Sequence, residues 1–97
     1  MGMTPEAKVK KQIRAILDRV GAYYSMPIGS GFGNAGTPDF LVCYKGKFIA
    51  IEAKAGKGKV TALQGHQLGK IMQPGGEAFI INDKNIDQLE EVLNEIR

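Results

Sequence analysis

Residues 40–54 read FLVCYKGKFIAIEAK, and this stretch decides the fold. The apolar runs 40–44 and 48–51 are each long enough for one strand of a sheet. Between them, Lys45-Gly46 has the length of a two-residue hairpin turn, although lysine is not the favoured first residue of such a turn. The stretch therefore predicts two neighbouring antiparallel strands.

The segment before the hairpin predicts a helix followed by a strand. Thr4 supplies an N-cap hydroxyl, and Pro5 suits the first helical position. Apolar residues then recur at helical spacing as far as Gly21, a residue type that commonly ends helices. We expect a strand at 22–28, and the glycine-rich stretch 29–37 predicts a loop.

The segment after the hairpin predicts two more helices and one more strand. Thr61 can cap a helix that stops near Pro74. A short strand is expected at 77–82, and an amphipathic helix with an acidic exterior is expected from Asn85 onward. The predicted order of elements is α-β-β-β-α-β-α, so the fold class is α/β.

Length and composition predict one domain without a membrane anchor. The 97 residues suffice for one compact core, so residues 1–97 are expected to form a single domain. No apolar run approaches the roughly 18 residues that a membrane helix needs. The N-terminus lacks the features of a secretory signal, and Cys43 is the only cysteine. Together these features favour a reducing, cytoplasmic setting.

Charge is distributed unevenly along the chain. Residues 1–81 hold eleven lysines and arginines against five acids, whereas the segment from Asn82 onward holds five acids against Lys84 and Arg97. The positive charge of residues 1–81 is suited to binding the phosphate backbone of a nucleic acid, although many basic proteins use such charge only to remain soluble.

The hairpin register brings charged residues together. With Lys45-Gly46 as the turn, directly opposed residues have numbers that sum to 91, which places Asp39 opposite Glu52. Two like charges with Cβ atoms about 5 Å apart are destabilising unless something compensates them, and a divalent cation would do so. Strand alternation puts Lys54 on the same face. The alternative is a surface hairpin with a Glu52–Lys54 ion pair.

A third acid, Glu6, lies in the predicted first helix in line with its apolar stripe. It could share a cation with Asp39 and Glu52, or its charge could only interact favourably with the helix dipole in the first turn. Oxygen ligands suit Mg²⁺ or Mn²⁺, and no histidine cluster or cysteine pair favours zinc. Such an ion would lower the pKa of a bound water, and Lys54 could orient that water or neutralise charge on a phosphate.

At this point the sequence resembles a known group of nucleases. Pro38-Asp39 followed by Glu52-Ala53-Lys54 is similar to the short PD-(D/E)XK nuclease signature. A longer and more specific pattern resembles the VRR-NUC domain. It comprises Glu6, GTPDFLV at 36–42, IEAK at 51–54, TALQ at 61–64 and Gly75-Gly76. The resemblance extends from Glu6 to about Ile81, which is nearly the whole chain.

The resemblance implies a restriction-endonuclease-like core, in which a mixed β-sheet is flanked by α-helices. It also implies metal-dependent cleavage of branched or flapped DNA. Stand-alone phage and bacterial members of the family are similar to Holliday junction resolvases and act as homodimers. A homodimer is also expected on geometry, because cutting two strands of a symmetric junction requires two sites related by a twofold axis.

The resemblance also assigns roles to residues of this sequence. Asp39 and Glu52 would be metal ligands together with the backbone carbonyl of Ala53, Lys54 would be the catalytic lysine, and Glu6 would be the acid of the first helix. Gln64 matches the glutamine of the helix after the lysine strand. Its spacing from Leu68 also predicts that it faces inward, and Gln67 is the alternative one turn on.

Four further residues are candidates for contacts with DNA. Ser30 and Asn34 lie in the glycine-rich loop, where the backbone of DNA could approach closely, although a plain connecting loop is an equal alternative. Lys57 and Lys59 could touch phosphates, although solvated lysines in a loop are the commoner explanation.

The remaining polar and aromatic residues suggest little chemistry. His66 is expected to face solvent, and Cys43 is expected to be a buried, inert thiol. Tyr23 and Tyr24 could stack on exposed bases, but neighbouring strand residues face opposite ways, so at most one is available.

These observations lead to one expected function and its alternatives. We expect a metal-dependent, structure-selective DNA endonuclease that acts as a homodimer on branched substrates. Within the same class, a nickase or a restriction-like nuclease is an alternative. Outside it, a DNA-binding module without catalytic activity would bind DNA unchanged after Asp39→Asn and would not cleave it.

Overall fold

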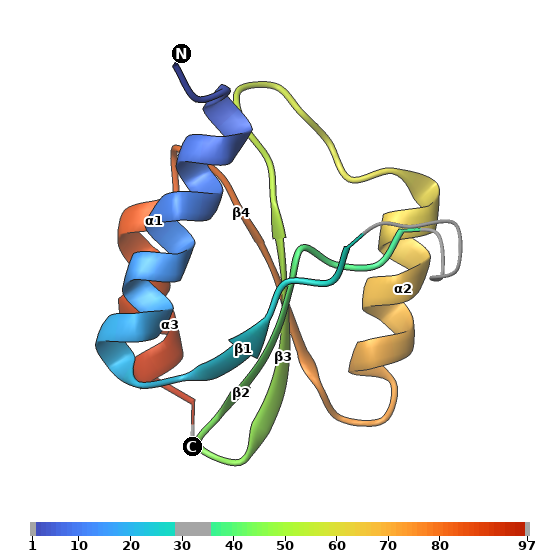
Figure 1. The fold of residues 1–97 in the computed structure, drawn as a ribbon. Coiled ribbons are helices and arrows are strands. Elements are labelled where there is room, and N and C mark those ends of the chain that lie inside the picture. Colours follow the sequence, from blue (N-terminus) through green and yellow to red (C-terminus); the bar gives the residue numbers. More distant parts are fainter. Residues whose placement is uncertain (1, 29–35, 97) are drawn as a thin grey trace.

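A computed structural model describes residues 2–28 and 36–96 of the chain. Figure 1 shows three layers, with helices α1 and α3 on one face of a β-sheet and helix α2 on the other. The elements in chain order are α1 (Pro5–Val20), β1 (Tyr23–Ser25), β2 (Phe40–Tyr44), β3 (Lys47–Ala53), α2 (Ala62–Met72), β4 (Glu77–Ile81), the 3₁₀ turn η1 (Ile86–Gln88) and α3 (Leu89–Asn94). The predicted order of elements and the α/β fold class are confirmed.

Helix α1 begins and ends where the sequence predicts. The Thr4 hydroxyl accepts a hydrogen bond from the backbone N–H of Ala7 at 3.1 Å, and Pro5 occupies the first helical position. Gly21 ends the helix in the left-handed conformation, with φ at 81°, and donates its N–H to carbonyls of the last turn. These caps fix the length of the helix whose first turn carries Glu6.

The sheet has strand order β1-β2-β3-β4. Phe40 pairs with Ile51 and Tyr44 with Lys47, which confirms the predicted antiparallel register. Both residues of the turn, Lys45 and Gly46, have positive φ angles of 52° and 76°, as the tight hairpin turns with matching twist require. Strand β4 pairs with β3 in parallel, and α2 forms the crossover between them, so the sheet is mixed.

Two elements are shorter than expected. The strand predicted at 22–28 is limited to Tyr23–Ser25, and Pro27, two residues beyond it, has no N–H to donate to a neighbouring strand. The closing helix starts as a 3₁₀ turn, because Asn82 and Asn85 first form a side-chain-capped turn in which the Asn82 side chain accepts from the Asn85 N–H at 3.1 Å.

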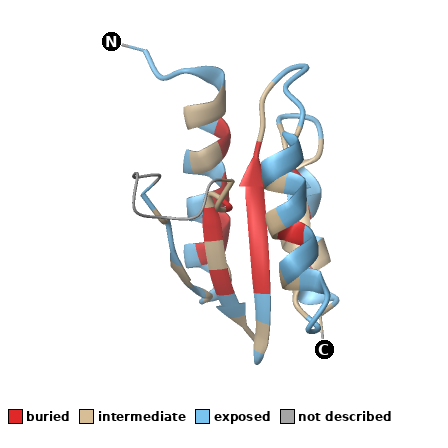
Figure 2. Ribbon diagram, turned by 90° about the vertical axis from the view of Figure 1, so that its right-hand side faces the viewer, coloured by how far each residue is buried: buried red, intermediate tan, exposed pale blue. Residues whose placement is uncertain are grey.

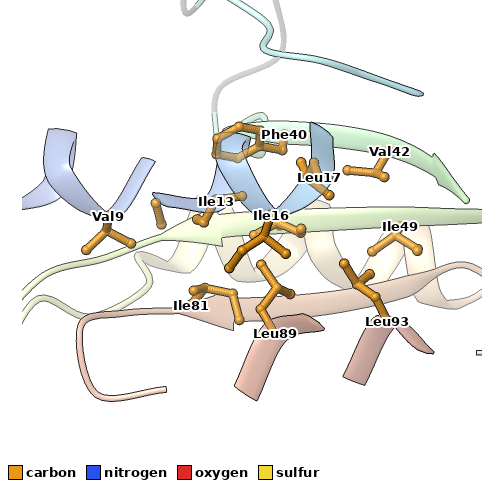
Figure 3. Close-up of a cluster of buried hydrophobic side chains, with 12 residues drawn as sticks. Val9, Ile13, Ile16, Leu17, Phe40, Val42, Ile49, Ile81, Leu89 and Leu93 are labelled. Atoms are coloured by element: carbon orange, nitrogen blue, oxygen red, sulfur yellow. The ribbon is translucent and has the colours of Figure 1, made fainter. Parts of the chain in front are cut away.

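The apolar core lies between the sheet and the layer of α1 and α3 (Figure 3). Its buried side chains come from both helices and from β2, β3 and β4. The opposite face is thinly covered, since α2 has a single fully buried residue, Leu68 (Figure 2). Within the part of the chain that the structure describes, no helix has the length and apolar character to cross a membrane.

Candidate active site

Asp39 and Glu52 lie at adjacent points of the central hairpin. Phe40 and Ile51 are opposed and point into the core beneath α1, so Glu52, one residue further along β3, points to the α2 face. Asp39 stands one residue before β2, and its Oδ2 accepts a hydrogen bond from the Ala53 N–H at 2.8 Å. The hairpin thus places two carboxyl groups side by side.

The Glu52 carboxyl is buried and incompletely paired. The residue is 2% exposed, and its Oε2 has no hydrogen-bond partner. Burial raises the pKa of the Glu52 carboxyl to about 8, and hydrogen bonding to Asp39 and the charge of Asp39 add to the rise. Near neutral pH, Glu52 therefore holds a proton that it shares with Asp39.

Asp39 keeps its negative charge. Burial would raise its pKa, but hydrogen bonds from Glu52 and from the Ala53 N–H, together with the charge of Lys10, outweigh burial and lower the pKa. The Lys10 ammonium lies 3.4 Å from Asp39 Oδ1. The two carboxyl groups thus differ in protonation although they share one hydrogen bond.

Lys54 and Glu6 both act on the pair. The charge of Lys54 lowers the pKa of Glu52, whereas the charge of Glu6 raises it. The Glu6 carboxylate pairs with Lys10 at 3.7 Å, and its side chain is 46% exposed. Glu6 is therefore close enough to influence Glu52 but belongs to an ion pair at the rim of the site.

The site has the chemistry that a hard divalent cation requires. Carboxylate oxygens are the ligands that Mg²⁺ and Mn²⁺ prefer, and the unpartnered Glu52 Oε2 is an acceptor that such a cation would satisfy. Asp39 and Glu52 form a pair; among residues 2–28 and 36–96, no three Asp, Glu, His or Cys side chains gather as a ready metal cluster. The carbonyl of Ala53, a neighbour of both, is a further oxygen donor.

Comparison with solved structures gives a clear match in architecture. One solved structure, described as a VRR_NUC domain, aligns with a TM-score of 0.76 over 92% of this chain and 97% of the other, at 23% sequence identity. The chain has the VRR_NUC fold. No family model and no curated protein matches the sequence.

In this VRR_NUC fold the predicted glutamine has a structural task. Gln64 is half-buried, and its side-chain oxygen accepts a hydrogen bond from the Thr61 N–H at 2.9 Å, while the Thr61 hydroxyl accepts from the Gln64 N–H at 3.2 Å. This reciprocal pair is a capping box at the start of α2. Among the described residues, Gln64 makes no hydrogen bond to Asp39 or Glu52. Gln67 is also half-buried.

The segment before Asp39 is fixed against the same helix start. Gly36 has a φ of 79°, and a Cβ atom there would lie 2.6 Å from the carbonyl carbon and oxygen of Leu63. Only glycine fits so close an approach in the left-handed region. The contact holds the entry to β2 beside the first turn of α2, which contains Gln64.

The remaining candidate residues lie outside this cluster. Lys57 and Lys59 are exposed in the connection between β3 and α2. The candidates Ser30 and Asn34 lie outside the described residues. His66 is exposed, as predicted. The prediction that Cys43 is buried is wrong, because its side chain is on the thinly covered α2 face and is exposed.

Lys10 is the functional residue that sequence reasoning missed. It is the cation that neutralises Asp39 in the absence of a metal. A signal was present, since Lys10 follows Glu6 by one helical turn and so lies on the same side of the helix. The prediction considered only acids on that side of the helix.

Proposed function

We propose that the protein is a metal-dependent nuclease that hydrolyses phosphodiester bonds in DNA. One observation carries the proposal: the buried Glu52 carboxyl, with one oxygen unpartnered, lies beside the half-buried Asp39 carboxyl and within electrostatic range of Lys54. The VRR_NUC fold supports it, because the neighbour that shares this fold is described by a nuclease domain name.

The residues have distinct tasks in this proposal. Asp39, Glu52 and the Ala53 carbonyl would hold Mg²⁺ or Mn²⁺, with Glu6 at the rim. When bound, such an ion makes a water more acidic and stabilises negative charge on a phosphate. The Lys54 ammonium orients the attacking water or neutralises charge on the scissile phosphate. Glu52 must release its proton for this, which a nearby cation promotes.

Other residues position the DNA and the site. Lys57 and Lys59 contact phosphates next to the scissile bond, as do Ser30 and Asn34 from the glycine-rich loop. Gln64 fixes the start of α2 beside the carboxyl pair and contacts the water or the substrate, with Gln67 as the alternative. These contacts set the register of the strand but carry little sequence information.

The proposal extends to branched DNA as substrate and to a homodimer as the active form. A domain of 97 residues offers little surface to one duplex, and two strands of a symmetric junction need two sites. A twofold dimer would supply both. Paired symmetric incisions would distinguish this enzyme from a nickase, and equal cleavage of all substrates would indicate a nonspecific nuclease.

A cleavage assay tests the proposal. The protein is incubated with four-way junctions, flaps and linear duplexes in Mg²⁺, in Mn²⁺ or in chelator. We expect cleavage only with metal, a loss of about a hundredfold or more in Lys54→Ala and Asp39→Asn, and wild-type cleavage in the control Lys84→Gln. Metal-dependent cleavage that survives both active-site substitutions contradicts the proposal.

A DNA-binding module without catalysis is the second candidate. One observation favours it: Lys10 already neutralises Asp39 at 3.4 Å, so the pair can persist without a metal. This candidate predicts DNA binding that is the same with metal and with chelator, no cleavage of any substrate, and unchanged binding in Asp39→Asn.

A further inference from the structure

Three exposed side chains form a row across the sheet. Tyr23 of β1 is directly opposite Cys43 of β2, and Cys43 is directly opposite Phe48 of β3. Tyr23 is 80% exposed, Phe48 is 48% exposed, and Cys43 is also exposed. Directly opposed residues share a face of the sheet, so all three point to the same side.

That side is the α2 face. The chain neighbours Tyr24, Val42 and Ile49 all pack in the core under α1 and α3, so the three residues of the row point the opposite way. Figure 2 looks onto this face and shows α2 over the β4 edge of the sheet, leaving β1 and β2 uncovered by the helix. Two aromatic rings thus stand on a sheet surface that no described helix covers.

The spacing of the two rings suits the bases of a nucleic acid strand. Tyr23 and Phe48 are two strands apart, which is roughly 10 Å at about 4.8 Å per strand. The small Cys43 side chain lies between them and leaves the space above it open. Exposed aromatic residues on neighbouring strands of a sheet can serve as a platform on which nucleobases stack.

The charge of this face suits a polyanion. Residues 53–76, which include all of α2, contain no acid. They contain the lysines Lys54, Lys57, Lys59 and Lys70. Lys70 borders the open hollow between the end of α2 and the hairpin that Phe48 also lines, and no acid lines that hollow. The acids of α3 lie in the layer on the far side of the sheet.

The row also lies in line with the carboxyl pair. Phe48 and Glu52 are on the same strand and the same face, four residues apart, which corresponds to roughly 13 Å. A strand of DNA that passes the carboxyl pair would reach the aromatic row within a few nucleotides.

We propose that the row formed by Tyr23, Cys43 and Phe48 binds unpaired bases of single-stranded DNA. The bases stack on the two rings, and Lys70, which lines the hollow beside Phe48, contacts a phosphate next to the base that stacks on Phe48. The inference rests on the proposed nuclease function only for the identity of the polyanion, and it adds the residues that hold a single-stranded segment of the DNA next to the cleaved bond.

Binding is measured by fluorescence anisotropy in chelator, where no cleavage occurs. The probes are a labelled single strand, a blunt duplex, and the same duplex with a single-stranded tail. We expect Tyr23→Leu and Phe48→Leu each to weaken binding of the single strand and the tailed duplex about tenfold. Binding of the blunt duplex should be unchanged.

Three controls sharpen the experiment. Tyr23→Phe and Phe48→Tyr retain the rings and should bind as the wild type does. Met3→Ala removes an exposed apolar side chain at the start of the chain and should have no effect. Lys70→Gln should reduce the slope of log affinity against log salt by about one unit.

Two results would overturn the inference. The first is wild-type affinity for single-stranded DNA in the Tyr23→Leu/Phe48→Leu double variant. The second is a lower molecular mass of the same double variant than of the wild type, measured in solution by light scattering, with DNA binding unchanged. That result would mark the row as a contact between copies of the chain. Binding is measured without metal, so the two proposals can fail separately. If the wild type does not cleave DNA, only the nuclease proposal is contradicted. If the wild type cleaves DNA and the row variants bind as the wild type does, only the proposed aromatic row is contradicted.

Discussion

The Ala53 N–H donates a hydrogen bond to Asp39 Oδ2 at 2.8 Å, just beyond Phe40 and Ile51, the last paired residues of the β2–β3 hairpin. The Asp39 side chain thereby replaces a backbone acceptor at the end of the hairpin. This bond orients the carboxylate, and Glu52 lies directly before the donor in the chain. The backbone thus fixes the relative position of the two carboxyl groups.

Metal-free stability should fall as the pH rises. Glu52 titrates near 4.5 in the unfolded chain, whereas burial beside Asp39 raises its pKa to about 8 in the fold. The folded state then holds a proton that the unfolded state has lost, so this contribution is complete below pH 4.5 and is lost as the pH rises through 8. In chelator, thermal melts should show a Tm that decreases from pH 5 to pH 8.

The Glu52→Gln variant tests the cause of this trend. A glutamine amide can donate a hydrogen bond to Asp39 as the protonated glutamic acid does, but it does not titrate. We expect a Tm that is flat over the same range and higher than that of the wild type by several °C at pH 8, since 1 kcal/mol corresponds to roughly 4–8 °C in a domain of this size. A wild-type-like slope in the variant would mean that another group titrates.

Removal of Lys10 should tighten metal binding. Its ammonium lies 3.4 Å from the Asp39 oxygen that a divalent cation would need, so the two cations compete. The pair is partly exposed, and we expect Lys10→Gln to bind Mn²⁺ about two- to fivefold more tightly, by calorimetry. Lys11→Gln, an exposed neighbour on the same helix, is the matched control. Weaker binding in the Lys10 variant would show that the ammonium supports the site instead of competing.

Alanine at Gly36 should destabilise the protein more than alanine at Gly21. Both glycines have φ near 80°, so both substitutions cost about 1–2 kcal/mol in backbone conformation. Only at Gly36 would the new Cβ meet backbone, 2.6 Å from Leu63, which adds about 1–3 kcal/mol of overpacking. Chemical denaturation should resolve the difference. Equal losses would indicate that the contact with α2 relaxes freely.

Substitutions of Gln64 should test its role in capping α2. Gln64→Ala removes one half of the capping box and should lower stability by about 1 kcal/mol, whereas Gln64→Glu retains the acceptor and should be as stable as the wild type. The Gln67→Ala variant should also keep its helix cap. The measurement is the free energy of unfolding, and equal stability of all three variants would contradict the capping role.

The hairpin could be predicted from the sequence because its determinants are local. A two-residue turn fixes which residues face each other, and the alternation of side chains then fixes the face. Both rules hold in the structure for Phe40 and Ile51, the outermost pair of the hairpin, and Asp39 and Glu52 follow that pair directly. The caps at Thr4, Gly21 and Thr61 are local in the same sense.

The surroundings of the hairpin depend on contacts that no local pattern contains. Lys10 reaches Asp39 only because α1 packs on the sheet with its first turns near the site. Cys43 is exposed because α2 covers only one side of its face, although the apolar residues around it suggest burial. The side chain of Gln64 had two possible uses, and the capping box is the one the structure contains.

The short connection between β2 and β3 also bears on the order of events during folding. A hairpin of this kind closes in microseconds, and it gains stability when other elements pack on it. The parallel pairing of β3 with β4 must wait until α2 has formed and crossed the sheet, and such long-range pairing is slow. We therefore expect the two acids to approach one another early in folding, before the second half of the sheet is in place.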